Sequence, residues 1–182
     1  MTIPNSVTTI DSDAFNGCSS LNDASIGKGV SSIGTRAFDG CNNLRTVTIN
    51  SDSIVNTTSY TADSNVSNIF GSQVREYIIG NSVNGIGAYA FNKTKLSSVK
   101  IGSGVKTIGE SAFNNCGFLS TVSFAAIEHT VTSIGNSAFY TCASLKSVVI
   151  PASVKEIGDM AFFGCSSLAE ILCYATIAPD LL

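Results

Sequence analysis

The chain has 182 residues, of which 44% are hydrophobic and 13% are charged, and its formal net charge is -3. This apolar content is sufficient for a buried core. The ten Lys and Arg residues are scattered along the chain, so we expect neither nucleic acid nor an anionic membrane surface as a partner. No apolar run approaches the ~20 residues of a membrane-spanning helix, and no secretion signal follows Met1. The missing signal fits either a cytosolic protein or a fragment of a longer secreted protein.

A repeated unit organises the chain from its first residues to its last. The unit reads I-x-x-x-V-x-x-I-G-x-x-A-F-x-x-C-x-x-L-x-x-V-x, and it recurs in seven copies of 22 to 30 residues. The copies span residues 3–25, 26–48, 49–78, 79–100, 101–123, 124–149 and 150–172, and a tail follows at 173–182. Because so short a unit cannot bury its apolar residues alone, the copies must stack on one another. The sequence therefore predicts a single domain over residues 1–182.

Each copy contains two segments with different patterns. The L-x-x-V-x-I segment is too short for a helix face, and its spacing suits a short strand with Leu, Val and Ile pointing inward. A turn follows, marked by residues such as Pro4, Gly27 and Pro151. The I-G-x-x-A-F-x-x-C segment then suits a short helical or 3₁₀ stretch on the opposite wall. The predicted fold is an α/β solenoid with one short parallel strand per repeat, all in one sheet.

Three copies depart from the pattern. The third contains a polar insertion at 51–67, and the pattern resumes at Phe70. The fourth has Thr94 in the Cys position and Leu96 one residue early, and the sixth has three extra residues at 127–129. Long insertions are often either binding elements or disordered segments. The sequence leaves both possibilities open for the insertion of the third copy.

The regular copies resemble a known repeat family. The run IPASVKEIGDMAFFGCSSLAEI at 150–171 is similar to the BspA-like leucine-rich repeat of bacterial and protist proteins. Five copies keep Ala-Phe-x-x-Cys-x-x-Leu intact, and the closing CYATIAP is similar to the segment that often ends such arrays. The resemblance covers residues 3–172. It implies a curved leucine-rich-repeat solenoid, on the cell surface or secreted, that serves adhesion or protein recognition.

Five of the six cysteines share one repeat position that we expect to face inward, where a small apolar side chain fits. They are Cys18, Cys41, Cys116, Cys142 and Cys165, and the sixth, Cys173, stands at a strand position that elsewhere holds Ile. We expect reduced core thiols. The alternative is one oxidised pair in neighbouring coils, such as Cys142 with Cys165. The spacing fits neither a zinc site nor a thioredoxin motif.

Signals for catalysis are weak. His129 is the only histidine, and it lies in the insertion of the sixth copy, where an exposed loop residue is expected. The GSGVKT run at 102–107 lacks the third glycine of a nucleotide-binding loop, and its glycines match the turn of the repeat. The carboxylates of Glu156 and Asp159 fall at variable positions and are expected to face solvent. The chain is therefore predicted to be no enzyme and to use no cofactor and no metal.

Three Asn residues match the N-glycosylation pattern, namely Asn56, Asn65 and Asn92. The chain contains 15 Asn and 43 Ser and Thr residues, so about this many matches arise by chance. We therefore attach no function to them.

A surface for a partner follows from the strand pattern. In L-x-x-V-x-I the third and fifth residues point away from the core. In chain order these residues are Asp23, Ser25, Thr46, Thr48, Glu76, Ile78, Ser98, Lys100, Thr121, Ser123, Ser147, Val149, Glu170 and Leu172. Most are short and polar, which suits a recognition surface of moderate affinity, although Thr and Val also simply suit strands.

We therefore expect a non-catalytic recognition or adhesion module that binds a protein or glycan partner on a concave sheet. Two alternatives remain. The chain is a structural spacer within a longer surface protein, or it is an intracellular scaffold for protein interactions.

Overall fold

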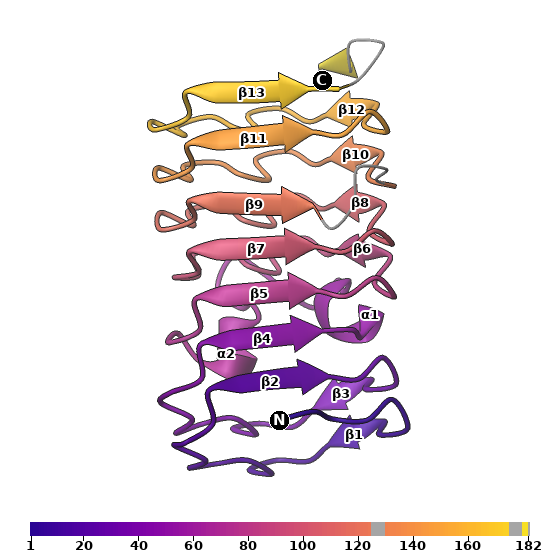
Figure 1. The fold of residues 1–182 in the computed structure, drawn as a ribbon, viewed down its shortest axis with the longest axis vertical. Coiled ribbons are helices and arrows are strands. Elements are labelled where there is room, and N and C mark those ends of the chain that lie inside the picture. The colour runs from indigo at the N-terminus through magenta and orange to yellow at the C-terminus, as the bar shows by residue number, and fades with distance from the viewer. Residues whose placement is uncertain (125–129, 175–179, 182) are drawn as a thin grey trace.

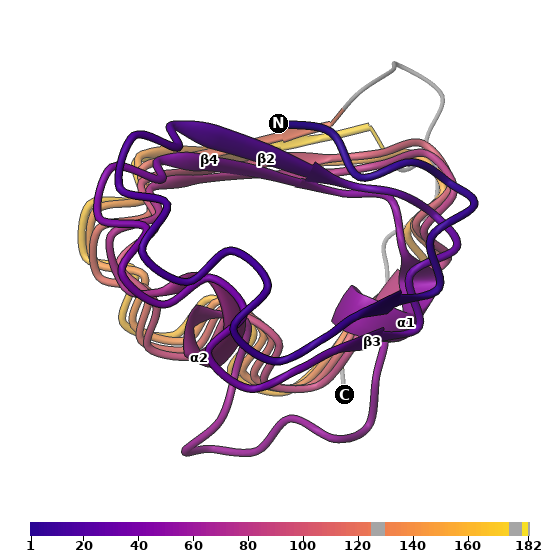
Figure 2. The same ribbon diagram turned by 90° about the horizontal axis from the view of Figure 1, so that it is seen from below.

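The chain forms a stack of coils, seen from the side in the computed structural model of Figure 1. The structure describes residues 1–124, 130–174 and 180–181. Seen along the stack, the coils follow nearly the same closed path, and one long side of that path is formed by strands (Figure 2). The expected solenoid of stacked repeats is therefore confirmed.

One four-residue strand per repeat forms the long side. The strands are β2 (Asp23–Ile26), β4 (Thr46–Ile49), β5 (Glu76–Ile79), β7 (Ser98–Ile101), β9 (Thr121–Phe124), β11 (Ser147–Ile150) and β13 (Glu170–Cys173). Their pairings are parallel, in the orders β2-β4-β5-β7-β9 and β11-β13. The expectation of one sheet is wrong between β9 and β11, which belong to separate sheets. The three extra residues of the sixth repeat, 127–129, lie between these two strands in the sequence but outside the described residues.

The orientation of the long strands follows from their sequence. In β7, Val99 and Ile101 are buried, whereas Ser98 is half-buried and Lys100 is exposed. Successive side chains of a strand point to opposite faces, and branched Val and Ile side chains pack well on a pleated surface. Each interior long strand therefore gives two apolar residues to the core and two outward residues to solvent.

A second side of the stack consists largely of two-residue strands. They are β1 (Thr9–Ile10), β3 (Ser32–Ile33), β6 (Gly85–Ile86), β8 (Thr107–Ile108), β10 (Ser133–Ile134), β12 (Glu156–Ile157) and β14 (Asp180–Leu181). They pair in parallel, in the orders β1-β3 and β14-β12-β10-β8-β6. In β3, β6, β8, β10 and β12 a glycine follows the Ile. This glycine lets the coils approach closely, since a Cβ on Gly109 would lie 2.7 Å from the backbone nitrogen of Ala88.

The A-F-x-x-C segment forms a series of 3₁₀-type turns rather than a continuous helix. In the fifth coil the amide of Cys116 donates to the carbonyl of Phe113, three residues earlier. Ser111 and Asn115, however, have φ angles of 53° and 57°, and a left-handed residue interrupts a right-handed helix. The apolar spacing alone does not distinguish such separate turns from a helix.

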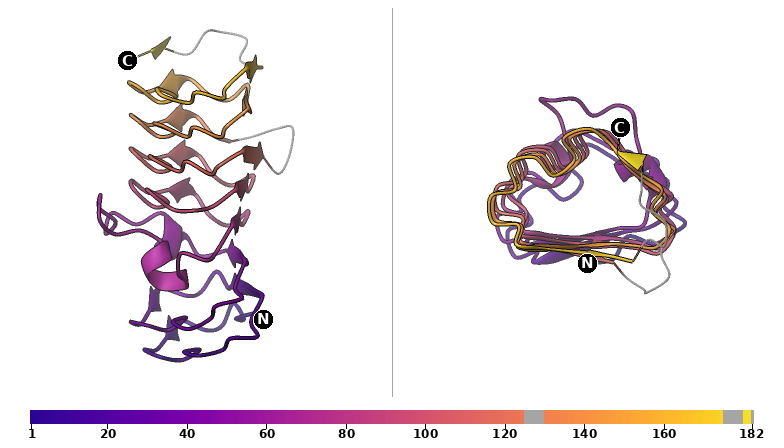
Figure 3. Two further views of the ribbon diagram at one scale, coloured as in Figure 1. Left: turned by 90° about the vertical axis from the view of Figure 1, so that its left-hand side faces the viewer. Right: turned by 90° about the horizontal axis from the view of Figure 1, so that it is seen from above.

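Two short helices replace these features in the third coil. α1 (Asp52–Val55) lies where other coils have a short strand, and α2 (Ser67–Phe70) lies where they have turns (Figure 2). Val55 and Val66 are fully buried, so the insertion at 51–67 is anchored in the core near both of its ends. Between the helices the chain loops out on the side away from the long strands, as Figure 3 also shows.

A ladder of aromatic rings runs through the core. The rings of Phe91, Phe113, Phe139 and Phe162 are stacked with neighbouring centroids 5.0 to 5.2 Å apart. Beside it, the Sγ atom of Cys116 donates a hydrogen bond to the carbonyl of Phe91 in the preceding coil, at 3.0 Å. The other buried cysteines make the same contact with the coil before them. Cysteine therefore combines a small apolar side chain with a donor for a buried carbonyl.

The six cysteines are free thiols in this structure. Four of them are buried, but Cys18 and Cys173 are exposed. The expectation that Cys18 faces a closed core is therefore wrong. Cys18 belongs to the first coil, at the end of the stack, where no coil of the chain covers its outer side.

Candidate functional site

The outward residues of the long strands form one side of the molecule, which we call the long-strand face (Figure 1). It consists of the two outward residues of each long strand, namely Asp23, Ser25, Thr46, Thr48, Glu76, Ile78, Ser98, Lys100, Thr121, Ser123, Ser147, Val149, Glu170 and Leu172. Every one of these residues is exposed or half-buried. Their part in binding stays a prediction.

Strand register aligns these residues in two rows along the stack. Thr46 lies between Asp23 and Glu76 in the first row, and Ser98 follows Glu76. Neighbouring strands of a sheet are about 4.8 Å apart. Each row therefore presents one side chain per coil at a regular spacing, which suits a partner that lies along the stack.

Both rows are interrupted at one place. Ser123 of β9 and Val149 of β11 occupy the same position in consecutive repeats, but their strands belong to different sheets. The long-strand face therefore divides into a five-strand part and a two-strand part.

The chain itself engages some polar groups of the face. The Thr46 hydroxyl donates to a carboxylate oxygen of Glu76 at 3.4 Å, and the amino group of Met1 lies 3.0 Å from the Asp23 carboxylate. Lys100 is exposed and has no ion pair within the described part of the chain. The charged groups of the face are this one Lys and three carboxylates, so the face has a mild negative excess.

Exposed apolar side chains lie on and beside the face. Leu172 is 41% exposed, and Ile78 and Val149 are half-buried. A further aromatic stack, not expected from the repeat pattern, lies on the turn side, where the ring centroids of Tyr140 and Phe163 are 5.3 Å apart. Its signal is the position directly after the ladder Phe, which holds aromatic residues in these two copies and polar ones in others.

The insertion of the third repeat lies on the side away from the long-strand face (Figure 3). The Nδ2 atom of Asn65 donates to the carbonyl of Asn92 at 2.7 Å, and the Nδ2 atom of Asn92 donates to the carbonyl of Ala62 at 2.9 Å. Both side chains are buried, so they anchor the insertion. The face and the insertion are therefore two separate candidate sites.

Burial disfavours a reactive thiol at Cys41 and Cys116, whereas a side-chain hydrogen bond with Cys142 lowers the pKa of the Cys165 thiol. Burial raises the pKa of the Cys41 thiol, and it raises that of Cys116 to about 12. A thiol is a poor nucleophile and metal ligand while it stays protonated. Glu156 and Asp159 are exposed, as expected, and His129 lies outside the described residues.

Neither a metal cluster nor a membrane-spanning helix is found in the described ranges. No group of three or more His, Cys, Asp and Glu residues there is placed to hold a metal ion. Within the same ranges, no helix has the length and apolar character needed to cross a membrane.

Known proteins share this repeat and this geometry. The family model for the BspA type leucine rich repeat region, in 6 copies, matches residues 1–116 and 67–178. One similar solved structure is a leucine rich cell surface protein from Faecalibacterium prausnitzii A2-165, with 26% identity, a TM-score of 0.53, and coverage of 95% of this chain and 53% of that chain. Another is a leucine rich repeat protein from T. pallidum, with 27% identity, a TM-score of 0.50, and coverage of 96% and 70%. The chain thus spans about half the length of the F. prausnitzii structure. No curated protein sequence matches it.

Proposed function

We propose that this chain, a member of the BspA-type leucine-rich repeat family, is a non-catalytic module. It binds another protein on its long-strand face. Membership of this family makes the chain a repeat module for protein interaction. The similar F. prausnitzii protein is described as a cell surface protein, and we extend that location to this chain. A role in adhesion and a concave shape of the face are part of the same proposal.

The observation that carries the proposal is the exposure of the long-strand face along the whole stack. The backbone groups of each long strand are hydrogen-bonded to the neighbouring strands. The outward side chains are therefore the groups available to contact a partner. Ser and Thr hydroxyls both donate and accept hydrogen bonds. Short side chains also lose little conformational entropy when a partner orders them.

The chemistry of the face favours a protein partner over a neutral glycan. Lys100, Glu76 and Glu170 can pair with charged side chains of a protein, and such complementarity guides association and orientation. Ile78 and Leu172 add apolar contact. The first alternative is a glycan partner. The second is that the chain is a spacer that binds no partner.

A binding experiment with matched variants tests the proposal. The face variant is Thr46→Arg with Thr121→Arg, at a half-buried and an exposed residue. Its control is Thr9→Arg with Thr107→Arg on the short strands, where both residues are exposed. Each form is immobilised and probed with an array of purified surface and secreted proteins, before and after enzymatic removal of their glycans. We expect a bound protein to lose affinity at least about tenfold, or ~1.4 kcal/mol, with the face variant and to bind the control normally.

The insertion is tested in the same array. Deleting residues 51–67 would remove the buried Val55 and Val66, so the insertion variant is Thr58→Arg with Asp63→Arg, both at exposed residues. Loss of binding with this variant alone would move the site to the insertion. Binding that disappears when glycans are removed would favour the glycan partner, and no binding by the intact chain would favour the spacer.

A further inference from the structure

A row of three backbone amides joins the turns of each regular coil to the next coil. In the fifth coil the amides of Ser111, Phe113 and Asn115 donate to carbonyls of alternate residues in the sixth coil, at 2.7 to 2.9 Å. The first, fourth and sixth coils make the same three bonds with the coils that follow them. The turns of a regular coil therefore present three donors, and the next coil supplies three matching acceptors.

The second coil, inside the stack, lacks these bonds. The amides of Arg36 and Phe38 have no acceptor within the described residues. The third amide of the row, that of Gly40, donates only to the carboxylate of the adjacent Asp39, at 3.1 Å. Phe38 is fully buried, and a buried amide without an acceptor is unfavourable. The row is therefore ready to bind a group that brings acceptors to it.

The missing acceptors are a consequence of α2. This helix replaces the turns of the third coil, on the side of the stack away from the long strands (Figure 2). Helical carbonyls accept from amides further along the same helix. Accordingly, the carbonyl of Val66 accepts from the amide of Phe70 at 3.0 Å, and that of Ser67 accepts from Gly71 at 2.9 Å. The helix thus uses its own carbonyls and leaves the amides of the second coil unpaired.

A hollow of about 260 Å³ lies between the second coil and α2. All three residues of the amide row line it, together with Asn42 and Ser67. The side chains of Asn42 and Ser67 have no hydrogen bond within the described part of the chain. The charged residues that line the hollow are one Arg and one Asp, so their charges offset each other. The site therefore favours a neutral ligand that is rich in acceptors.

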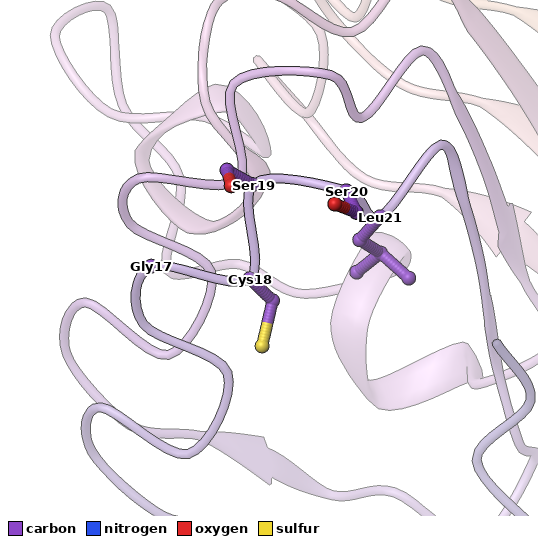
Figure 4. A pocket seen from close by; sticks show the side chains of 5 residues that line it. All are labelled: Gly17, Cys18, Ser19, Ser20 and Leu21. Carbon is purple, nitrogen blue, oxygen red and sulfur yellow. The ribbon is translucent and has the colours of Figure 1, made fainter.

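A second hollow shows that concavity alone does not create such a site. Residues 17–21 of the first coil line a hollow of about 500 Å³, and Figure 4 shows their side chains. The amide of Gly17 there donates to the carbonyl of Asp39 at 2.8 Å, and those of Cys18, Ser19 and Leu21 donate within the first coil. Unpaired amides in a row thus distinguish the hollow beside α2.

We propose that the hollow beside α2 binds a short main-chain segment of another protein, whose alternate carbonyls accept from Arg36, Phe38 and Gly40. A peptide main chain is neutral and repeats its carbonyls at the spacing that the next coil supplies elsewhere in the stack. Main-chain bonds of this kind give affinity when a partner adds a segment to an open edge. The hollow is smaller than the range of about 300–1,000 Å³ usual for small-molecule sites, so the bound residues have small side chains.

This site is separate from the long-strand face. It uses no residue of that face, and α2 lies on another side of the stack (Figure 2). The proposal therefore stands whether or not the long-strand face binds a partner.

Amide resonances of the intact, ¹⁵N-labelled chain test the proposal directly. The probe is the capped peptide acetyl-Ser-Gly-Ala-Gly-Ser-amide, added up to about 10 mM so that a millimolar dissociation constant is detected. Sodium acetate, added in the same way, tests a free anion. Ser67→Tyr fills the hollow from α2, and its matched control is Ser53→Tyr at an exposed serine of α1.

The peptide should shift the amide resonances of Arg36, Phe38 and Gly40 and leave those of the equivalent Ser111, Phe113 and Asn115 unchanged. Ser67→Tyr should lose this response, and Ser53→Tyr should keep it. Without peptide, the Phe38 amide should exchange with deuterium faster than the Phe113 amide, because only the latter has an acceptor. The peptide should slow that exchange.

Four results would each overturn the proposal. They are no shift at the highest peptide concentration, shifts that are not centred on the amide row, an equal response to acetate, and an unchanged response in folded Ser67→Tyr. The amide spectrum of each variant also verifies that it is folded.

Discussion

The third and fifth coils solve the same packing problem with different residues. The fifth coil follows the repeat, with Phe113 stacked between two other Phe rings. The third coil lacks the ladder Cys, and Tyr77 takes the strand position of Val. In this coil the rings of Phe70 and Tyr77 together connect Phe38 to the rest of the ladder. The ring centroid of Phe70 lies 5.1 Å from that of Phe38 and 6.4 Å from that of Tyr77.

The difference between these coils is confined to one part of the stack. Opposite the long strands, α1 and α2 replace the short strand and the turns. On the long side, β5 still pairs in parallel with β4, with Glu76 opposite Thr46 and Ile79 opposite Ile49. The long-strand face therefore tolerates large changes behind it, which is what a recognition surface on a repeat scaffold requires.

The largest expected effect concerns the aromatic ladder in both coils. Phe113→Ala should lower the free energy of unfolding by about 3–5 kcal/mol, because the coils above and below cannot collapse into the space. If the third coil is a full member of the ladder, Phe70→Ala should have an effect in the same range. Urea unfolding monitored by circular dichroism measures both. A loss below about 1 kcal/mol at Phe70 would break the comparison and make the third coil a loose insertion.

A smaller effect is expected from the close approach of the coils. Gly109→Ala should destabilise the chain by about 1–3 kcal/mol, because the new Cβ would lie within 3 Å of backbone atoms of the fourth coil. Gly117→Ala is the matched control in the same coil, since nothing lies within 4 Å of a Cβ there. Thermal unfolding compares the two variants, and equal midpoints would mean that the coils are not packed this closely.

The smallest effect separates the two tyrosines of the third coil. The hydroxyl of Tyr77 is buried and has no hydrogen-bond partner in the described structure, whereas that of Tyr60 donates to the carbonyl of Ile54 at 2.7 Å. Tyr77→Phe should therefore raise the free energy of unfolding by about 1 kcal/mol, and Tyr60→Phe should lower it by a similar amount. If urea unfolding shows that Tyr77→Phe destabilises the chain, the hydroxyl of Tyr77 has a hydrogen-bond partner in solution.

The repeat pattern was sufficient to predict the stack, the strand of each repeat and the residues that face outward. In β7, for example, Val99 and Ile101 alternate with Ser98 and Lys100, and this alternation determines which side chains reach the core. The candidate face followed directly from the same alternation. Its use by a partner did not, because Ser and Thr suit both a binding surface and a merely soluble strand.

Other features could not be predicted from the pattern. Two-residue strands such as β8 are too short to show a periodicity of two. The turns depend on left-handed backbone at Ser111 and Asn115, which are residues that also fit a helix. The division between β9 and β11 has no signal in the alternation of either strand, and the exposure of Cys18 depends on its place in the first coil of the stack.

Site-specific photo-crosslinking to a bound partner tests the central claim most directly. A photoreactive amino acid is placed at Lys100, an exposed residue of the long-strand face, or at Thr58, an exposed residue of the insertion. Irradiation of the complex followed by mass spectrometry then identifies which position lies against the partner. The account predicts a crosslink from position 100 and none from position 58, and a crosslink from position 58 alone would contradict it.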